Sequence, residues 1–333
     1  MYVAGHLEGS IDLGGGALAA AGSRDILLAS FYADGGHRWS KSFGSSQADT
    51  GRDLVVDGTD LYISGQMGGA IDFGGGTRTT GATDAFIAAF STLGAYRWDQ
   101  VGTTPGWAMA GALSAAAGTL HGCFGFDSTL SIGGQVVPSL GSFDSFTRVY
   151  ARDGSEQWSK QIGGPGDVSV QQAALDSDGT LFVTGYFSSA IDLGDGQRDS
   201  AGGNDVLLAS YGSNGSLRWS RRFGGPEEDA GRAIAFGAGG DLIVAGEASS
   251  AIDFGRGPID YAGGQDLFVA RFDRDGGCLW STGAGGSGDE RVADVAVVGT
   301  TTIVAGSFDG RTELGTDVHT SEGGHAILLR LDP

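Results

Sequence analysis

An aspartate and an arginine stand three residues apart at two places in the chain, each time just before a run of small and β-branched residues. Asp49 and Arg52 form the first pair, and Asp229 and Arg232 form the second. A carboxylate and a guanidinium can form a strong ion pair between neighbouring elements, or can bind a polar ligand with charge-assisted hydrogen bonds. The ion-pair interpretation predicts a lock between structural units, and the ligand interpretation predicts a binding site.

A different kind of candidate is the segment 103–109, which lacks the acidic pair and contains an additional tryptophan, Trp107. An indole near a channel mouth can stack on a sugar or an apolar side chain, or it can pack beneath a loop. The same irregular part of the chain holds His121 and the pair Gln171–Gln172. The candidate ligand-binding residues are therefore Trp107, His121, Asp49, Arg52, Asp229 and Arg232.

Recurring aspartates form two further sets. Those in the repeated phrase Ile-Asp-Leu/Phe-Gly are candidate ligands for weak Ca²⁺ binding, because calcium prefers oxygen ligands; they are Asp12, Asp72, Asp192 and Asp253. The favoured interpretation is a structural role in a glycine turn, and weak Ca²⁺ binding is the alternative. The second set precedes an apolar run, and we expect it to accept backbone N–H groups of the preceding turn; it consists of Asp25, Asp84, Asp144, Asp205 and Asp266. No cofactor other than Ca²⁺ is expected.

Catalytic motifs find little support in the chain. The five histidines are scattered without a metal-binding spacing. The Gly-x-Gly runs lie between predicted strands and not at a strand-to-helix turn, so phosphate binding is not indicated. We expect no enzyme activity. The alternative is a glycan-active enzyme with paired carboxylates, which would need two carboxyl groups about 5 to 9.5 Å apart.

Repeated strands must position these residues. Trp39, Trp98, Trp158, Trp219 and Trp280 recur about every 60 residues, which is typical of a repeat architecture. In one copy, apolar or alternating runs at 181–185, 205–211, 217–223 and 232–236 are separated by glycine-containing segments, which predicts four short strands. Stacking such four-stranded sheets around an axis covers both faces and protects the edges. The sequence therefore predicts an all-β fold, a β-propeller of about six four-stranded blades, with the 232–236 strand innermost and the tryptophan strand outermost. We expect each indole to cover the neighbouring blade.

We expect a single β-propeller domain over residues 1–333. Its repeats are predicted at about 2–60, 61–119, 120–180, 181–241, 242–301 and, in part, 302–333. The first and last blades are incomplete in this chain, which opens at a second strand and stops after a third strand at 326–331. An outer and an inner strand upstream of Met1 would complete six blades. The alternative is a five-blade ring with frayed extra strands.

Longer phrases surround the predicted strands: Gly-x-x-x-x-Ala-Ile-Asp-Phe/Leu-Gly, Ala-Gly-Gly-x-Asp-x-Leu/Phe, Asp-Gly-Gly-x-x-Trp-Ser and Phe-Gly-Gly. These phrases resemble the bacterial β-propeller repeat (SBBP) family, in particular versions found in myxobacterial envelope and secreted proteins. The resemblance covers essentially the whole chain, although Ser131 replaces the hairpin aspartate in the third repeat. It implies a propeller that is commonly exported, and it implies no particular ligand or activity.

The chain is strongly acidic. Twenty Lys and Arg stand against 40 Asp and Glu, which gives a formal net charge of −20. This balance disfavours nucleic acid, whose binding depends on neutralising phosphates, and it suits cations or neutral ligands such as glycans. No apolar run is long enough for a membrane span, so we expect no membrane insertion.

These observations predict a non-catalytic binding or scaffolding β-propeller of the bacterial cell envelope or exterior. We expect a monomer that engages a protein or a glycan through its loop face and channel mouth. No signal sequence is present in the chain, which the predicted truncation would explain. A purely structural role without a specific ligand is the remaining alternative.

Overall fold

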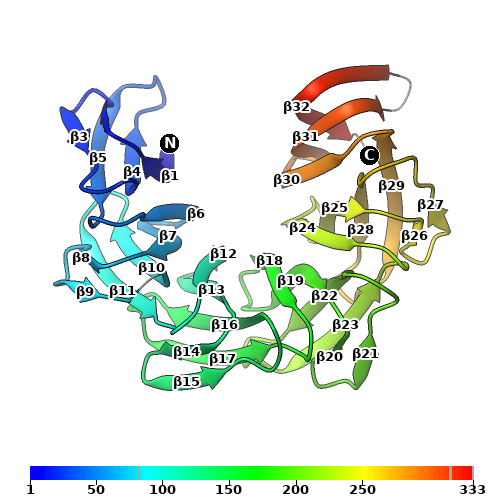
Figure 1. Cartoon of the computed structure of the whole chain (residues 1–333), viewed down its shortest axis with the longest axis horizontal. Helices are drawn as coiled ribbons and strands as arrows, with labels where there is room; N and C mark the ends of the chain where they lie inside the picture. The colour runs from blue at the N-terminus through cyan, green and yellow to red at the C-terminus, as the bar shows by residue number, and fades with distance from the viewer. Residues whose placement is uncertain (82, 315–316, 332–333) are drawn as a thin grey trace. The chain divides into compact units, whose positions relative to one another are not determined.

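The computed structural model describes residues 1–81, 83–314 and 317–331. Within these ranges every regular element is a β-strand, and the main sheets are antiparallel and recur along the chain (Figure 1). The predicted all-β fold of repeated four-stranded sheets is therefore confirmed. The described ranges contain no helix with the length and apolar character needed to span a membrane.

The chain divides into two compact units. Unit 1 comprises Met1–Ile162 and Leu175–Gly179, and unit 2 comprises Gly163–Ala174 and Thr180–Pro333. The single-domain organisation stays a prediction, and each unit is described by itself below.

Four sheets are complete, and in each the strands hydrogen bond in the order in which they follow one another in the chain. Their strands are β6 (Thr50–Asp57), β7 (Asp60–Met67), β10 (Asp84–Ser91) and β11 (Tyr96–Gly102) in sheet II; β12 (Ala108–Ala116), β13 (Thr119–Phe126), β16 (Asp144–Ala151) and β17 (Glu156–Ile162) in sheet III; β18 (Val168–Leu175), β19 (Leu181–Phe187), β22 (Asp205–Tyr211) and β23 (Leu217–Phe223) in sheet IV; and β24 (Asp229–Phe236), β25 (Leu242–Ala248), β28 (Asp266–Phe272) and β29 (Cys278–Gly286) in sheet V. The tryptophan strand and the strand of small residues are the two edges of sheets II, III and IV, as predicted. In sheet V the tryptophan strand β29 also pairs with β31 (Thr301–Leu314), through Gly285 and Gly286, so that sheet continues into the last one.

The first and last sheets have three main strands each. Sheet I consists of β1 (Tyr2–Leu7), β4 (Asp25–Phe31) and β5 (His37–Phe43). Sheet VI consists of β30 (Glu290–Val298), β31 (Thr301–Leu314) and β32 (Asp317–Leu331). The described sheets thus follow the predicted arrangement of three strands, four complete sheets and three strands.

The prediction for the last copy was wrong in one respect. Instead of a separate third strand at 326–331, β31 and β32 form one long hairpin, in which pairing resumes at Gly310 and Ser321 after a bulge. Four of the other copies close a small turn with an aspartate and the third has Ser131, whereas Glu313 stands at that place here and pairs with Val318 in the ladder. Strand pairing therefore continues in the last copy where the other copies interrupt it.

A short two-stranded hairpin connects β1 to β4 in sheet I and the second strand to the third in sheets II to V, in segments predicted to be loops. These hairpins are β2 (Ser10–Asp12) with β3 (Ala17–Ala19), β8 (Ala70–Ile71) with β9 (Arg78–Thr79), β14 (Thr129–Ile132) with β15 (Gln135–Pro138), β20 (Ala190–Asp192) with β21 (Gln197–Asp199), and β26 (Ile252–Asp253) with β27 (Pro258–Ile259).

The second and third strands of the sheets form the core. In β10 every residue from Ala85 to Phe90 is fully buried, which requires cover on both faces of the strand. One face belongs to a cluster in which Ile87 of sheet II packs in the same core as Leu120 and Phe124 of sheet III. Each such aliphatic or aromatic side chain contributes about 1.5 to 3 kcal/mol when fully buried.

The tryptophans link consecutive sheets within each unit. The indole N–H of Trp39 donates to the carbonyl of Thr92 at 3.2 Å, and that of Trp219 donates to the carbonyl of Arg274 at 2.8 Å. Trp98 makes the corresponding bond to Arg152 at 3.0 Å. Each carbonyl lies in the tight turn between the third and fourth strands of the next sheet. The prediction that the indole covers the neighbouring sheet is confirmed for these three residues.

Candidate functional site

The first strands of sheets II and V carry bulges that determine where their arginines point. The register shifts between Gly51 and Asp53 in β6, and between Gly231 and Ala233 in β24. The extra residue in each strand is therefore the predicted arginine, Arg52 or Arg232, and a bulge re-aims the side chain of its extra residue.

The two arginines do not pair with the aspartates at the start of their strands. Arg232 Nε donates to Glu247 Oε2 at 2.7 Å, and Arg52 Nη2 donates to Gln66 Oε1 at 3.3 Å. The predicted Asp49–Arg52 and Asp229–Arg232 ion pairs are therefore wrong. The reason is local, because the bulge turns each arginine toward the adjacent second strand.

Asp49 and Asp229 instead close the loops that precede β6 and β24. Asp49 is fully buried and accepts the backbone N–H groups of Ser45 and Gly68, both at 2.7 Å. Asp229 accepts those of Gly225 at 2.8 Å and Ser249 at 3.2 Å. Burial raises the pKa of both carboxyl groups, that of Asp229 to about 6. Neither residue is placed to meet a ligand.

Arg232 belongs to a polar network that crosses the first strands of unit 2. Its Nη1 donates to Gln171 Oε1 at 3.4 Å, and its guanidinium lies 5.8 Å from the ring centre of Tyr186. Glu247 accepts Arg232 with one oxygen and the backbone N–H of Val292 with the other, at 2.9 Å. The Arg232 side chain keeps 30% of its surface exposed, whereas Glu247 keeps 3%. The exposed arginine is thus held by a buried carboxylate.

Gln172 extends this network across three sheets. Its Oε1 accepts the backbone N–H of Ile234 at 2.5 Å, and its Nε2 donates to Asp294 Oδ1 at 2.9 Å. The two glutamines singled out in the sequence therefore connect β18 to β24 and β30. Their positions are explained by the attachment of one sheet to the next.

Trp107 and His121 make contacts of their own in unit 1. The Trp107 ring is half-buried and lies 5.7 Å from the ring of Phe143, and the Trp107 backbone N–H donates to Asp127 at 2.7 Å. His121 is fully buried, with Nε2 3.0 Å from the Thr147 hydroxyl. Burial lowers the pKa of His121 to about 3, so the imidazole is neutral at physiological pH. A binding role for Trp107 stays a prediction, and His121 offers no surface to a ligand.

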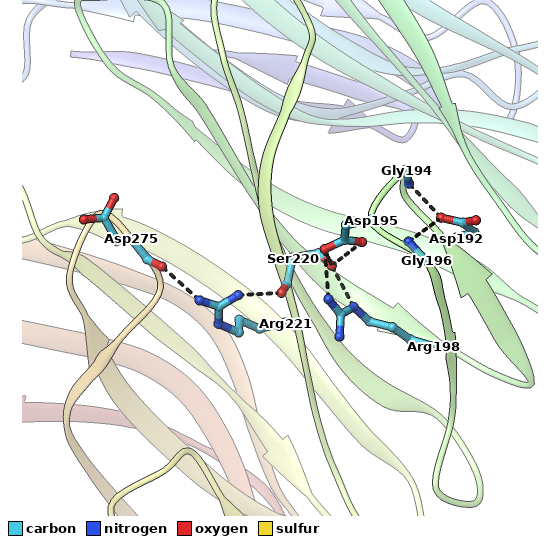
Figure 2. Close-up of polar contacts among 8 residues, drawn as sticks. All are labelled: Asp192, Gly194, Asp195, Gly196, Arg198, Ser220, Arg221 and Asp275. Atoms are coloured by element: carbon cyan, nitrogen blue, oxygen red, sulfur yellow. Dashed lines mark hydrogen bonds and ion pairs between the residues drawn. The ribbon is translucent and has the colours of Figure 1, made fainter.

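The hairpin aspartates each close their own turn. In Asp192, one carboxylate oxygen accepts the N–H groups of Gly194 at 2.8 Å and Gly196 at 3.2 Å (Figure 2). Asp12, Asp72 and Asp253 bind the corresponding turns in the same way. The described part of the chain contains no group of three or more His, Cys, Asp or Glu side chains that could hold a metal. Calcium binding by these aspartates stays a prediction, and their observed hydrogen bonds support a role in the turns.

The hairpin that carries Asp192 is also fixed to the outer edge of its sheet. Arg198 donates to the Ser220 hydroxyl at 2.8 Å and pairs with Asp195 at 2.8 Å (Figure 2). Arg221 lies over the ring of Trp219 and donates to the backbone carbonyl of Asp275 at 3.1 Å. The charged residues around this hairpin are thus used to position it and to attach the next sheet.

An open groove that the sequence did not predict lies among the loops of unit 2. We call it the Tyr261 groove; its volume is about 620 Å³ and it is lined by Pro226, Glu227, Ser249, Ser250, Ala251, Asp260 and Tyr261. Such a volume is within the range of ligand-binding clefts. The groove forms where the loop closed by Asp229 meets the ends of two neighbouring segments of sheet V.

The groove combines an aromatic ring with acids and hydroxyl groups. Tyr261 keeps 40% of its surface exposed. Partial burial, together with the charges of Asp266, Glu227 and Asp289, raises the pKa of its phenol. The groove is therefore electronegative, and it favours neutral or cationic ligands over anionic ones. One sequence feature could have indicated the groove. The residue before the repeated phrase Ala-Gly-Gly is Tyr261 in this copy, whereas it is Ser200 in the preceding copy.

Taken together, the fold and this groove define an all-β protein of repeated four-stranded antiparallel sheets with an acidic loop surface. No model of a known protein family matches the chain. The chain is similar to the regulatory protein FlaEY of Caulobacter vibrioides, with 29% identity over 196 residues. The aligned residues make up 56% of this chain and 20% of FlaEY. The match therefore spans about a fifth of the length of FlaEY.

Proposed function

We propose that this chain is a β-propeller of about six blades, of the SBBP type, that acts as a non-catalytic binding or scaffolding module in the bacterial cell envelope or exterior. The recurring sheets, the indole bonds between consecutive sheets and the repeated sequence phrases support the propeller. The phrases also support export, through the resemblance to exported proteins.

The observation that carries the binding role is the exposed ring of Tyr261 between Glu227 and Asp260. An aromatic face with flanking acceptors suits a sugar ring, since the aromatic ring covers the apolar C–H surface of the sugar and the carboxylates accept hydrogen bonds from its hydroxyl groups. The negative charge of the groove selects for neutral or amino sugars. A neutral or cationic glycan is therefore the ligand that this chemistry fits best.

A protein partner is the second candidate. FlaEY is named as a regulatory protein, and a regulatory role favours binding over catalysis for the segment that is similar in the two proteins. A basic peptide segment would fit the same acidic groove. The purely structural alternative predicts no binding of either kind.

The enzyme alternative requires two accessible carboxyl groups at the reaction distance. The recurring acids Asp49 and Asp229 are buried and hydrogen bonded to backbone N–H groups, which suits loop closure. Glu227 and Asp260 are the acids of the groove. They are the pair that a glycan-active enzyme would use.

The experiment is a binding panel followed by a hydrolysis assay. We expect calorimetry to detect binding of a neutral cello-oligosaccharide or of a cationic chitosan oligomer. We expect it to detect no binding of an anionic oligogalacturonate. A Lys-rich peptide tests the protein candidate. Release of new reducing ends from any bound oligomer would replace the binding proposal with the enzyme. Absence of binding across the whole panel would contradict a role for the groove.

A further inference from the structure

The tight turn between β22 and β23 carries one of only two asparagines in the chain. Asn214 is exposed in this turn and is followed by Gly215, whose φ is +78°. The backbone N–H of Gly212 donates to the carbonyl of Ser216 at 2.8 Å, and the N–H of Gly215 donates to the carbonyl of Gly212 at 2.8 Å. Asn-Gly is favoured in such hairpin turns because both residues tolerate a positive φ. The turn therefore presents an Asn-Gly peptide bond to solvent.

Ser216 holds the side-chain amide of Asn214. Asn214 Oδ1 accepts the backbone N–H of Ser216 at 3.0 Å and the Ser216 hydroxyl at 2.6 Å. When a nucleophile adds to the amide carbon, this oxygen takes up the negative charge, and hydrogen-bond donors already in place stabilise that charge. The backbone nitrogen of Gly215 can be the nucleophile, since its attack on Cγ closes a five-membered ring within the chain. Glycine has no Cβ to obstruct this approach.

Other copies of the turn show how an aspartate fits at this position. In sheet III the equivalent residue is Asp153, whose Oδ1 accepts the backbone N–H of Ser155 at 3.0 Å and the Ser155 hydroxyl at 2.6 Å. In sheet I it is Asp34, which accepts the backbone N–H of Gly36 at 2.9 Å. A conversion of Asn214 to aspartate therefore preserves the hydrogen bonds of the turn. Isoaspartate adds a methylene to the backbone, and the turn cannot keep the same bonds around it.

The second asparagine, Asn204, has different surroundings. Its Nδ2 donates to the carboxylate of Glu228, and its backbone carbonyl accepts the N–H of Asp229 at 2.7 Å. The next residue is Asp205, which begins β22 and is fully buried. The Cβ of Asp205 and its fixed place in the strand both oppose attack by the Asp205 nitrogen on the amide. Asn204 is therefore an internal control for Asn214.

We propose that Asn214 is a site of spontaneous deamidation, promoted by the hydroxyl of Ser216. The backbone nitrogen of Gly215 bonds to Asn214 Cγ, the Cγ–Nδ2 bond breaks, and ammonia leaves with the proton from the Gly215 N–H. Water then opens the cyclic imide at either carbonyl, which gives aspartate or isoaspartate and adds one negative charge. The hydrogen bond from Gly215 to Gly212 must open first, as it can in an exposed turn. This modification does not depend on the proposed glycan binding.

The test is a timed incubation of the folded chain at mildly alkaline pH, followed by peptide mapping with mass spectrometry that separates aspartate from isoaspartate. We expect Asn214 to convert to a mixture of both products while Asn204 stays intact. Asn214→Gln should show no conversion, because glutamine would have to close a six-membered ring. Ser216→Ala removes the hydroxyl and keeps the backbone N–H, and it should slow the conversion about threefold. Ser216→Thr keeps the hydroxyl and should convert at the wild-type rate.

A free peptide of residues 209–219 serves as the reference for the same sequence without a fixed turn. The proposal is overturned if Asn214 of the folded chain stays intact over a period in which the peptide converts completely. It is also overturned if Asn204 converts before Asn214. A conversion rate in Ser216→Ala that equals or exceeds the wild-type rate rejects the promoting role of the hydroxyl. All of these substitutions lie in an exposed turn, so the variants are expected to fold.

Discussion

Arg222 Nη1 donates a hydrogen bond to Oδ2 of Asp205 at 2.6 Å, although the carboxyl group is fully buried. The arginine keeps 32% of its side-chain surface exposed, so one end of the pair reaches solvent while the other neutralises an interior charge. This arrangement lets sheet IV bury an aspartate that its loop needs for closure. In sheet V the position that corresponds to Arg222 is Gly283, so Asp266 has no arginine partner there.

Removal of this arginine should therefore destabilise the fold. Arg222→Ala leaves the Asp205 carboxylate buried without its cation, and we expect a loss of about 2 kcal/mol in the free energy of unfolding, reduced from the fully buried case by the partial exposure of the arginine. Arg218→Ala is the matched control, since its contact with the exposed Asp275 is 3.9 Å long. Urea denaturation measures the free energy of unfolding of both variants. Equal losses of stability in Arg222→Ala and Arg218→Ala would contradict this account of Asp205.

The glycine turns that receive the indoles give a second test. Gly276 has a φ of +79°, and a Cβ there would lie 3.0 Å from Trp219. Gly257 has a φ of +101° with open space around it. Each alanine substitution introduces backbone strain, which should lower the free energy of unfolding by about 1 kcal/mol. Gly276→Ala should lose about 1 kcal/mol more, because it also displaces the indole. Denaturant midpoints that do not separate the two variants would show that the indole contact adds nothing.

The buried carboxyl group of Glu290, which interacts with that of Asp266, predicts how stability depends on pH. The folded pKa of Glu290, about 7, lies above its ordinary value of 4.5. The folded state then binds the proton more tightly, so this stabilisation is complete below about pH 4.5 and is lost as pH rises to about 7. Each unit of pKa difference corresponds to about 1.4 kcal/mol.

We expect Glu290→Gln to flatten the decline in stability between pH 5 and pH 7, as measured by urea unfolding in EDTA. Glu227→Gln, at the groove surface, is the control and should leave the slope unchanged. A wild-type slope retained in Glu290→Gln would assign the pH dependence to another carboxyl group, of which Asp229 is the first to examine.

The hairpin aspartates should be replaceable by asparagine but not by alanine. Asp192→Asn keeps an oxygen that accepts the N–H groups of Gly194 and Gly196, whereas Asp192→Ala removes it. We expect the alanine variant to lose about 1 kcal/mol and to exchange its turn amide protons faster. Hydrogen exchange that is equally fast in both variants would mean that the charge, and not the acceptor, closes the turn.

The sequence predicted the repeated features better than the singular ones. Trp219 and Asp205 could be predicted from their recurrence, because the equivalent residues Trp98 and Asp144 make the corresponding contacts in other copies. The hydrogen-bond partner of Arg232 could not be predicted from the sequence. A bulge of one residue decides which way the arginine points, and the local sequence pattern does not indicate the bulge. The Tyr261 groove was missed for a related reason: its residues come from separate loops, and only the break in the repeat at Tyr261 marked the place.

The binding account is tested most directly by titrating wild type, Tyr261→Ala and Tyr32→Ala with the same neutral or cationic oligosaccharide. Tyr32 is a 59% exposed tyrosine of unit 1 and lies outside the groove. We predict that Tyr261→Ala binds at least about tenfold more weakly than wild type, a loss of about 1.4 kcal/mol, while Tyr32→Ala is unchanged. Equal affinities of wild type and Tyr261→Ala would contradict the account, because they would place the ligand away from the groove.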